Sequence, residues 1–215
     1  MTNFVKRIVP VVLLLATVAF AADPVALKPP AGAKVAIVEF VDLECPMCAH
    51  AAPIVKEASD KYSIPLIRHD FPLPMHAWSR RAAVIARYFD TKSVPVANDF
   101  RDYIFAHQRE VEPGTLLSMA KKFATDHKID LPFQVDPTGA LEKKVNEDYA
   151  LGQSLGVDAT PAIWVVGNGV PPQKLQSGDI SGGSARLYQI IESVQQQVEA
   201  NTPKTASKKA TKKKS

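Results

Sequence analysis

Residues 35–52, VAIVEFVDLECPMCAHAA, join an apolar segment to a pair of cysteines and then to a helical segment. The first seven residues are rich in β-branched side chains, at a length typical of a buried strand. A short acidic turn then leads into Cys45-Pro46-Met47-Cys48, and the composition from Pro46 to about residue 62 favours a helix. The stretch therefore predicts a strand, a turn, and a helix whose first turn carries both cysteines.

The position of the cysteines gives them a specific chemistry. A thiol at the start of a helix faces backbone N–H groups without partners and the positive end of the helix dipole, and both favour the thiolate. Pro46 suits the first helical turn, where its missing N–H costs nothing. Cys48 lies three residues after Cys45 on the same helix face, where it can close a disulfide onto Cys45. The pattern predicts a redox-active pair.

Cys45 and Cys48 are the only cysteines in the chain. A structural zinc site needs four ligands, and a c-type haem needs a histidine directly after the second cysteine, where Ala49 stands. A structural disulfide across so short a loop removes little entropy from the unfolded state. We expect redox exchange and no bound metal. A structural pair and a Cu(I) site completed by Met47 or His50 stay open as alternatives, since soft ligands select Cu(I).

The pattern of residues 1–21 is typical of a secretory signal peptide. Lys6 and Arg7 precede an apolar run at residues 8–20 that is too short to span a bilayer, and Ala19-Phe20-Ala21 fits the cleavage pattern. An uncleaved membrane anchor is the alternative. Export predicts an oxidising compartment, the bacterial periplasm, where disulfide chemistry has client proteins.

The net charge of +4 is concentrated at the two ends of the chain. Lys6 and Arg7 lie in the leader, and residues 202–215 carry six lysines and no acid. Without these eight cations the core has a net charge of −4, so we expect no nucleic-acid partner for the folded domain. The tail has no side chains that could form a core and is expected to be disordered. Its lysines predict contact with anionic surfaces, and a purely solubilising tail is the alternative.

The remaining segments alternate between strand and helix patterns. Residues 64–71 predict a second strand parallel to the first, followed by helices at 77–89, 96–107, 113–127 and 137–155, the last with Asp136 as its N-cap. Strand character returns at 162–166, Asn168-Gly169 predicts a hairpin turn, and 174–180 is the predicted return strand. A closing helix is predicted at 184–200. Its buried stripe is Leu187, Ile190, Ile191, Val194 and Val198.

This order of elements resembles the DsbA-like branch of the thioredoxin fold over about residues 25–200. The resemblance rests on Cys45-Pro46-Met47-Cys48, on Glu39 six residues before Cys45, on Thr160-Pro161 before the late strand, and on HDFPLPMH at 69–76. It implies an α/β thioredoxin fold with an inserted all-helical subdomain. The implied division is a signal peptide (1–21), the first part of the thioredoxin-like domain (22–75), the helical insert (76–156), the second part (157–201) and a disordered tail (202–215).

The resemblance also implies roles for individual residues. Cys45 is the exposed nucleophile that forms a mixed disulfide with a client, and Cys48 is the buried resolving thiol. Pro161 follows a cis peptide bond. Glu39 matches a buried acid that moves protons to and from Cys48, with an outward-facing carboxylate as the alternative.

Three further residues are implied to contact clients. The backbone of Thr160 lies beside the sulfurs, where an extended client chain can pair with it. Pro46 and Met47 lie between the cysteines, and Met47 offers an apolar contact where strongly oxidising relatives have a histidine. Because Met47 and Thr160 both depart from the oxidising pattern, the direction of electron flow stays open.

The implied function is that of an exported thiol:disulfide oxidoreductase acting on reduced or misoxidised secreted proteins. It needs no cofactor because the disulfide is the redox group, but a second redox partner must restore the pair. A reductase or isomerase of the same fold is one alternative, and a non-catalytic chaperone or metal-binding module is another. We assign His50, His69 and His76 surface or packing roles, since no paired ligand spacing accompanies them.

Overall fold

The computed structural model describes residues 27–176 and 178–202. The predicted leader and nearly all of the predicted tail lie outside these residues. Within the described ranges, no helix is long and apolar enough to cross a membrane. In chain order the elements are β1 (Val35–Val41), α1 (Pro46–Tyr62), β2 (Leu66–Asp70), α2 (Ser79–Asp90), α3 (Val94–Ala106), the 3₁₀ helix η1 (Gln108–Glu110), α4 (Leu116–Asp126), α5 (Ala140–Ser154), β3 (Ala162–Gly167), β4 (Val170–Lys174) and α6 (Ala185–Asn201).

The strands form one mixed sheet in the order β2-β1-β3-β4. β1 pairs in parallel with β2 and antiparallel with β3, so that Val38 lies opposite Ile67 on one side and Trp164 on the other. β4 pairs antiparallel with β3 at the edge of the sheet. The predicted parallel pairing of the first two strands and the late hairpin are both confirmed.

Strand β1 is buried along its whole length because helices cover both faces of the sheet. On one face Val35 and Ile37 pack in a core that includes residues of α1 and the predicted stripe of α6. On the other face Val38 and Phe40 pack against Trp164, and Tyr149 and Leu151 of α5 border them. A strand buried on both faces is typically a continuous apolar run, which explains the composition of β1.

Helix α5 approaches the sheet closely at a glycine. A Cβ atom on Gly152 would lie 2.6 Å from the Phe71 ring and 3.0 Å from the Phe40 ring. Any larger residue would force the helix outward. The Phe71 ring in turn stacks on Tyr149 of α5, with ring centroids 4.4 Å apart.

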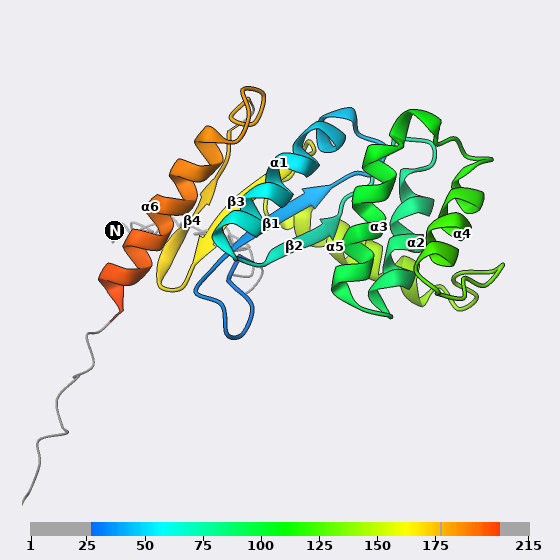
Figure 1. Cartoon of the computed structure of the whole chain (residues 1–215), viewed down its shortest axis with the longest axis horizontal. Coiled ribbons are helices and arrows are strands. Elements are labelled where there is room, and N and C mark those ends of the chain that lie inside the picture. The colour runs from blue at the N-terminus through cyan, green and yellow to red at the C-terminus, as the bar shows by residue number, and fades with distance from the viewer. Residues whose placement is uncertain (1–26, 177, 203–215) are drawn as a thin grey trace, which may run out of the picture.

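Helices α2, α3 and α4 stand together at the end of the sheet towards which β1 points (Figure 1). Phe89, Phe100 and Phe123 pack at the centre of these helices, with centroid separations of 4.7 to 5.3 Å. The same apolar cluster continues through Leu43 to Cys45 and Cys48. The core of the helical insert and the surroundings of the cysteines are therefore one packed unit.

Buried ion pairs also join these helices to the sheet. Asp70, at the end of β2, accepts hydrogen bonds from Nε and Nη2 of Arg101 on α3, at 3.1 and 2.8 Å. Arg87 of α2 places its Nε 2.7 Å from the same carboxylate and also pairs with Asp148 of α5. Asp70 and Arg101 are each 1% exposed. Burial favours the neutral form of Asp70, but the charges of Arg101 and Arg87 outweigh the effect of burial and lower the pKa of Asp70.

Three predicted elements have boundaries that are wrong by three or more residues, and one of them is α4, which starts at Leu116 rather than 113. The return strand was predicted at 174–180, but β4 starts directly after the Asn168-Gly169 turn and ends at Lys174. Pro171 and Pro172 argued against a strand there, yet prolines are tolerated at a sheet edge, where no neighbour needs their N–H. Helix α5 begins at Ala140 rather than 137, although the Asp136 carboxylate still accepts the backbone N–H groups of Leu141 and Glu142.

Candidate active site

Cys45 occupies the N-cap position of α1. Its backbone is extended, with φ −73° and ψ 121°, and Pro46 follows in the first helical turn. The pKa of Cys45 is lowered to about 5, first by the hydrogen bond from the Cys48 thiol. Burial acts in the opposite direction, while hydrogen bonds from Thr160 and from backbone N–H groups of the first turn add to the lowering. A thiol with this pKa is almost entirely thiolate at neutral pH.

Cys48 has the opposite character. It is 1% exposed, and burial, followed by its interaction with Cys45, raises its pKa well above the ordinary value. The backbone N–H of Asp42 donates a hydrogen bond to the Cys48 sulfur at 3.5 Å. Both cysteines are free thiols in this structure. The pair therefore combines one acidic thiol with one that holds its proton.

Cys45 is less accessible than the sequence predicts. It was expected to be exposed, but only 6% of its surface is open to solvent. The Thr160 carbonyl oxygen lies 3.3 Å from the Cys45 sulfur and accepts a hydrogen bond from it when the thiol is protonated, so the loop before β3 covers Cys45. Cys45 nevertheless remains the more accessible member of the pair.

The loop that covers Cys45 contains the predicted proline. The Thr160–Pro161 peptide bond is cis, as the resemblance implies. The Thr160 hydroxyl oxygen is buried, and apart from the Cys45 sulfur, whose pKa it lowers, it has no hydrogen-bond partner among the described residues. It therefore remains free to donate to a sulfur that carries negative charge.

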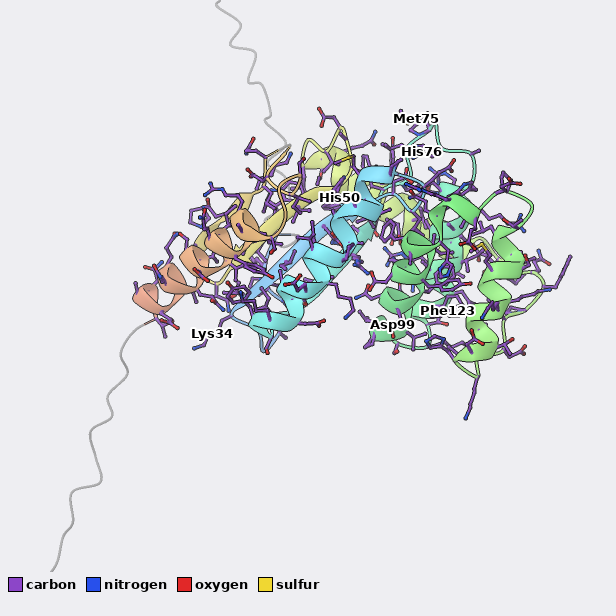
Figure 2. All side chains as sticks on the ribbon, turned by 45° about the horizontal axis from the view of Figure 1, so that its top comes forward. Lys34, His50, Met75, His76, Asp99 and Phe123 are labelled. Atoms are coloured by element: carbon purple, nitrogen blue, oxygen red, sulfur yellow. The ribbon has the colours of Figure 1, made fainter. Side chains whose placement is uncertain are left out.

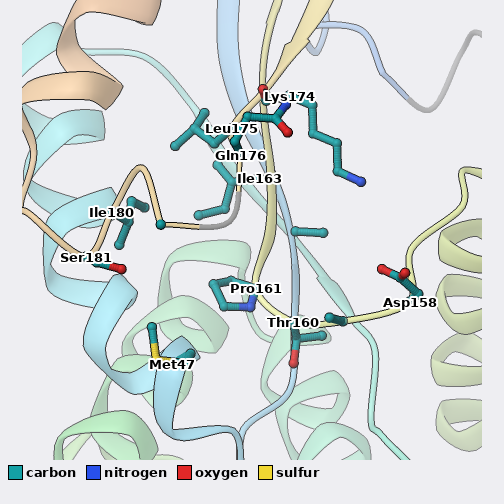
Figure 3. Close-up of a pocket in the computed structure, with 13 residues that line it drawn as sticks. Met47, Asp158, Thr160, Pro161, Ile163, Lys174, Leu175, Gln176, Ile180 and Ser181 are labelled. Carbon is teal, nitrogen blue, oxygen red and sulfur yellow. Dashed lines mark hydrogen bonds between the residues drawn. The ribbon is translucent and has the colours of Figure 1, made fainter.

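A groove of about 310 Å³ begins beside this loop. Figure 3 shows Met47, from the first turn of α1, and Pro161, directly before β3, among its lining residues. Met47 is 49% exposed, an unusual position for a large apolar side chain. The other apolar lining residues include Ile163, Leu175 and Ile180. The redox pair thus adjoins an open surface that can accept apolar side chains.

Glu39 is buried on β1, so the alternative of an outward-facing carboxylate is wrong. Its Oε1 lies 2.5 Å from Nε of Arg68, and Nη1 of Arg68 lies 2.7 Å from Asp102. Burial raises the pKa of Glu39, and Arg68 opposes this without cancelling it. Sequence reasoning missed Arg68 because strand periodicity marks it only as one polar position in β2.

The histidines have ordinary contacts. His69 stacks on Phe40 and places Nδ1 2.8 Å from Asp148. His50 and His76 both lie in the upper half of the view in Figure 2, and Nδ1 of His76 is 2.7 Å from the Asp42 carboxylate. In the part of the chain that the structure describes, no three His, Cys, Asp or Glu side chains form a group suited to a metal ion.

The lowered pKa of Cys45 predicts that the stability of the reduced protein depends on pH. An unfolded cysteine titrates near 8.5, whereas folded Cys45 titrates at about 5. A lowered pKa stabilises the fold fully above the unfolded value, and this contribution is lost as the pH falls through the folded value. At pH 7 it amounts to about 2–3 kcal/mol, because the pH is then about two units above the folded pKa.

The oxidised protein is the matched control, since it lacks only the two thiols, and Cys48, whose pKa is raised, stays protonated below pH 7 in the reduced protein and adds no pH dependence there. We expect guanidinium unfolding of both forms to show the reduced form gaining about 2–3 kcal/mol over the oxidised form between pH 4 and pH 7. An equal difference at both pH values would contradict the acidic thiol.

Comparisons with known proteins agree with this geometry. A family model described as thioredoxin matches residues 30–177. Among curated proteins, the chain is similar to the Na(+)/H(+) antiporter NhaA 3 of Salinispora tropica and to NhaA 1 of Salinispora arenicola, each 29% identical over 143 residues. Each match covers 66% of this chain but only 21% of the antiporter. The chain therefore spans a small part of the length of these relatives.

Solved structures match over most of the chain. The thiol-disulfide exchange protein alpha-DsbA2 of Wolbachia pipientis is 20% identical, with a TM-score of 0.59, covering 81% of this chain and 86% of that protein. The alpha-DsbA1 protein of the same organism is 14% identical, with a TM-score of 0.62, and the match covers 81% of this chain and 92% of that protein. DsbA2 of Pseudomonas aeruginosa is 21% identical, with a TM-score of 0.56, and the match covers 83% of this chain and 96% of that protein. These likenesses establish the predicted α/β thioredoxin fold with a helical insertion.

Proposed function

Because this chain belongs to the thioredoxin family, we propose that it is an exported thiol:disulfide oxidoreductase that exchanges disulfides with secreted proteins through Cys45 and Cys48. One observation carries the proposal: Cys45, in contact with Thr160 of the groove lining, has a pKa of about 5, while the pKa of its neighbour Cys48 is raised. An acidic thiol is a good leaving group in disulfide exchange, so this pairing suits donation of a disulfide.

The reaction follows from the two thiols. In the oxidised protein a client thiolate attacks the Cys45 sulfur, which breaks the Cys45–Cys48 bond and forms a mixed disulfide. Cys48 leaves as a thiolate and takes up a proton, because burial raises its pKa. A second client thiolate then attacks the client sulfur and releases Cys45 as a thiolate. The client has lost two electrons to form its disulfide, and the cysteine pair has gained them.

The groove supports the assignment of client contacts. The exposed side chain of Met47 is unbranched and adapts to different apolar partners. The Thr160 carbonyl lies 3.3 Å from the Cys45 sulfur, and in the mixed disulfide, where this sulfur carries no hydrogen, a client backbone N–H could donate to the carbonyl. We propose Pro46, Met47 and Thr160 as client-binding residues, and Pro161 as the residue that holds this loop against Cys45.

We propose that Glu39 supplies and removes protons during exchange. Its raised pKa supports this role, since a carboxyl group titrating nearer to neutral pH can both accept and donate a proton. The contacts of Arg68 extend from Glu39 to Asp102, whose side chain is 25% exposed. Arg68 and Asp102 thus link the buried acid to the surface between α1 and α3.

Export and the client class rest on the sequence of residues 1–21 and on the chemistry of the site. In the periplasm the clients are reduced or misoxidised secreted proteins, and a separate redox protein restores the pair. The division at residues 22–75, 76–156 and 157–201 belongs to the same proposal, as does contact of the lysine-rich tail with anionic surfaces.

The reduction potential of the Cys45/Cys48 couple tests the proposed direction of electron flow. A Cys45 pKa of about 5 lies between about 7 in thioredoxin and about 3.5 in DsbA. We therefore expect equilibration with glutathione to give a potential between about −270 and −120 mV, the values of those two proteins. A potential at or below about −270 mV would instead favour the reductase alternative.

A further inference from the structure

The turn that leads into α1 is held from three directions. The Asp42 carboxylate accepts the backbone N–H groups of Glu44 and Leu73, at 2.7 and 2.6 Å. The Glu44 carboxylate accepts the N–H groups of Trp78 and Ser79 at the start of α2. These contacts fix the beginning of the turn to the loop after β2 and to α2.

The third contact comes from η1, within the helical insert. Gln108, in η1 directly after α3, donates from Nε2 to the carbonyl oxygens of Leu43 and Cys45, at 2.9 and 3.0 Å. Both hydrogens of one side-chain amide are thus used on the two carbonyls that flank residue 44. More than sixty residues of chain separate the donor from its acceptors, so this contact exists only in the folded molecule.

The Cys45 backbone is restrained on both sides by these contacts. Its N–H donates to the Asp42 carbonyl at 3.1 Å, and its carbonyl accepts the Ala49 N–H at 3.1 Å in addition to Gln108. The orientation of this residue decides whether its sulfur faces the backbone N–H groups of Met47 and Cys48, both of which lower the pKa of Cys45. Leu43 is 1% exposed, so its carbonyl has little access to water as a substitute donor.

We propose that Gln108 is a positioning residue, through which the helical insert holds the Leu43–Cys45 turn so that the Cys45 sulfur faces the first N–H groups of α1. This inference rests on the proposed function, because it assigns a role in preparing Cys45 for exchange. Without the amide, the turn can relax, and the sulfur loses alignment with its donors. The insert therefore contributes to the reactivity of the redox pair.

Three variants separate the donor function of Gln108 from its size. Gln108→Met keeps a side chain of similar length but donates no hydrogen bond, so we expect it to raise the Cys45 pKa by about 0.5 to 1 unit. The glutathione equilibrium should shift about 3- to 10-fold towards the disulfide. Gln108→Glu should have a larger effect, because a carboxylate repels both carbonyls and the thiolate. Gln108→Lys keeps donors and should leave the pKa unchanged or lower it.

The readouts are thiolate absorbance against pH and glutathione equilibration, measured on the full chain. Thr115→Ala is the control, since it removes the hydrogen bonds of the Thr115 hydroxyl with the Glu110 carbonyl of η1 and the Glu112 N–H but leaves the Gln108 amide in place. The inference is overturned if Gln108→Met and Gln108→Glu keep the wild-type pKa, or if Thr115→Ala shifts it equally. It is also overturned if Gln108→Lys behaves like Gln108→Met. Failure of the proposed function looks different, because the wild-type protein itself would then lack an acidic thiol.

Discussion

The Cys48→Ser variant is expected to accumulate mixed disulfides with client proteins, whereas the Cys45→Ser variant accumulates almost none. With a pKa of about 5, Cys45 is a thiolate at pH 7, while Cys48 is held as a thiol by its raised pKa. Without Cys48 as the resolving thiol, a mixed disulfide at Cys45 has no internal route to release. The remaining cysteine of Cys45→Ser is both protonated and 1% exposed.

The difference in thiolate fraction alone predicts at least about 100-fold slower capture by Cys45→Ser than by Cys48→Ser at pH 7. Both variants are reacted with a protein that carries an activated disulfide, and adducts are counted by non-reducing electrophoresis and mass spectrometry. The Cys45→Ser/Cys48→Ser double variant gives the background. Equal capture by the two single variants would contradict the assignment of the roles of the cysteines.

The Asp70→Ala variant is expected to lose about 3 kcal/mol of unfolding free energy. It removes the carboxylate that pairs with Arg101 and Arg87, and it leaves Arg101 buried at 1% exposure with Asp90 as its remaining partner. Breaking a buried ion pair on one side typically costs about 3–5 kcal/mol. The remaining contact to Asp90 places our expectation at the lower end of that range.

Denaturant unfolding of the reduced protein measures this loss directly. Asp126→Ala is the matched control: its pair with Lys122 also joins a carboxylate to a cation at 2.8 Å, but both side chains are more than half exposed. Exposed pairs of this kind contribute little, about 0–1 kcal/mol. If both variants lose the same small amount, the buried network does not stabilise the attachment of the insert to the sheet.

Local patterns were sufficient to predict most of the fold. The β-branched run of β1, the period of the α6 stripe and the Asn168-Gly169 turn each depend on neighbours in sequence, and the structure confirms all three. The predicted return strand is misplaced, and β4 instead contains Pro171 and Pro172, which break strands in general. Their tolerance depends on β4 lying at the sheet edge, which is a property of the whole sheet.

The contacts around the cysteines were predictable only in part. Cys45 at a helix start follows from the position of Pro46, and the cis bond before Pro161 follows from the resemblance. Gln108 gave no signal, because a glutamine after a helix is an ordinary surface residue until folding brings it to the Leu43 carbonyl. The pairing of Arg68 with Glu39 is equally non-local. The sequence predicts Glu39 as a buried acid without naming a partner, whereas in the structure it forms an ion pair with Arg68.

The central claim is that Cys45 turns over disulfides in client proteins. The most direct test mixes a small amount of oxidised protein with a large excess of a reduced, unfolded test protein, with glutathione disulfide as the final oxidant. We predict many client disulfides formed per protein molecule, and loss of this turnover in Cys45→Ser. Formation of at most one client disulfide per protein molecule would contradict the claim and favour a binding module that captures clients without catalysis.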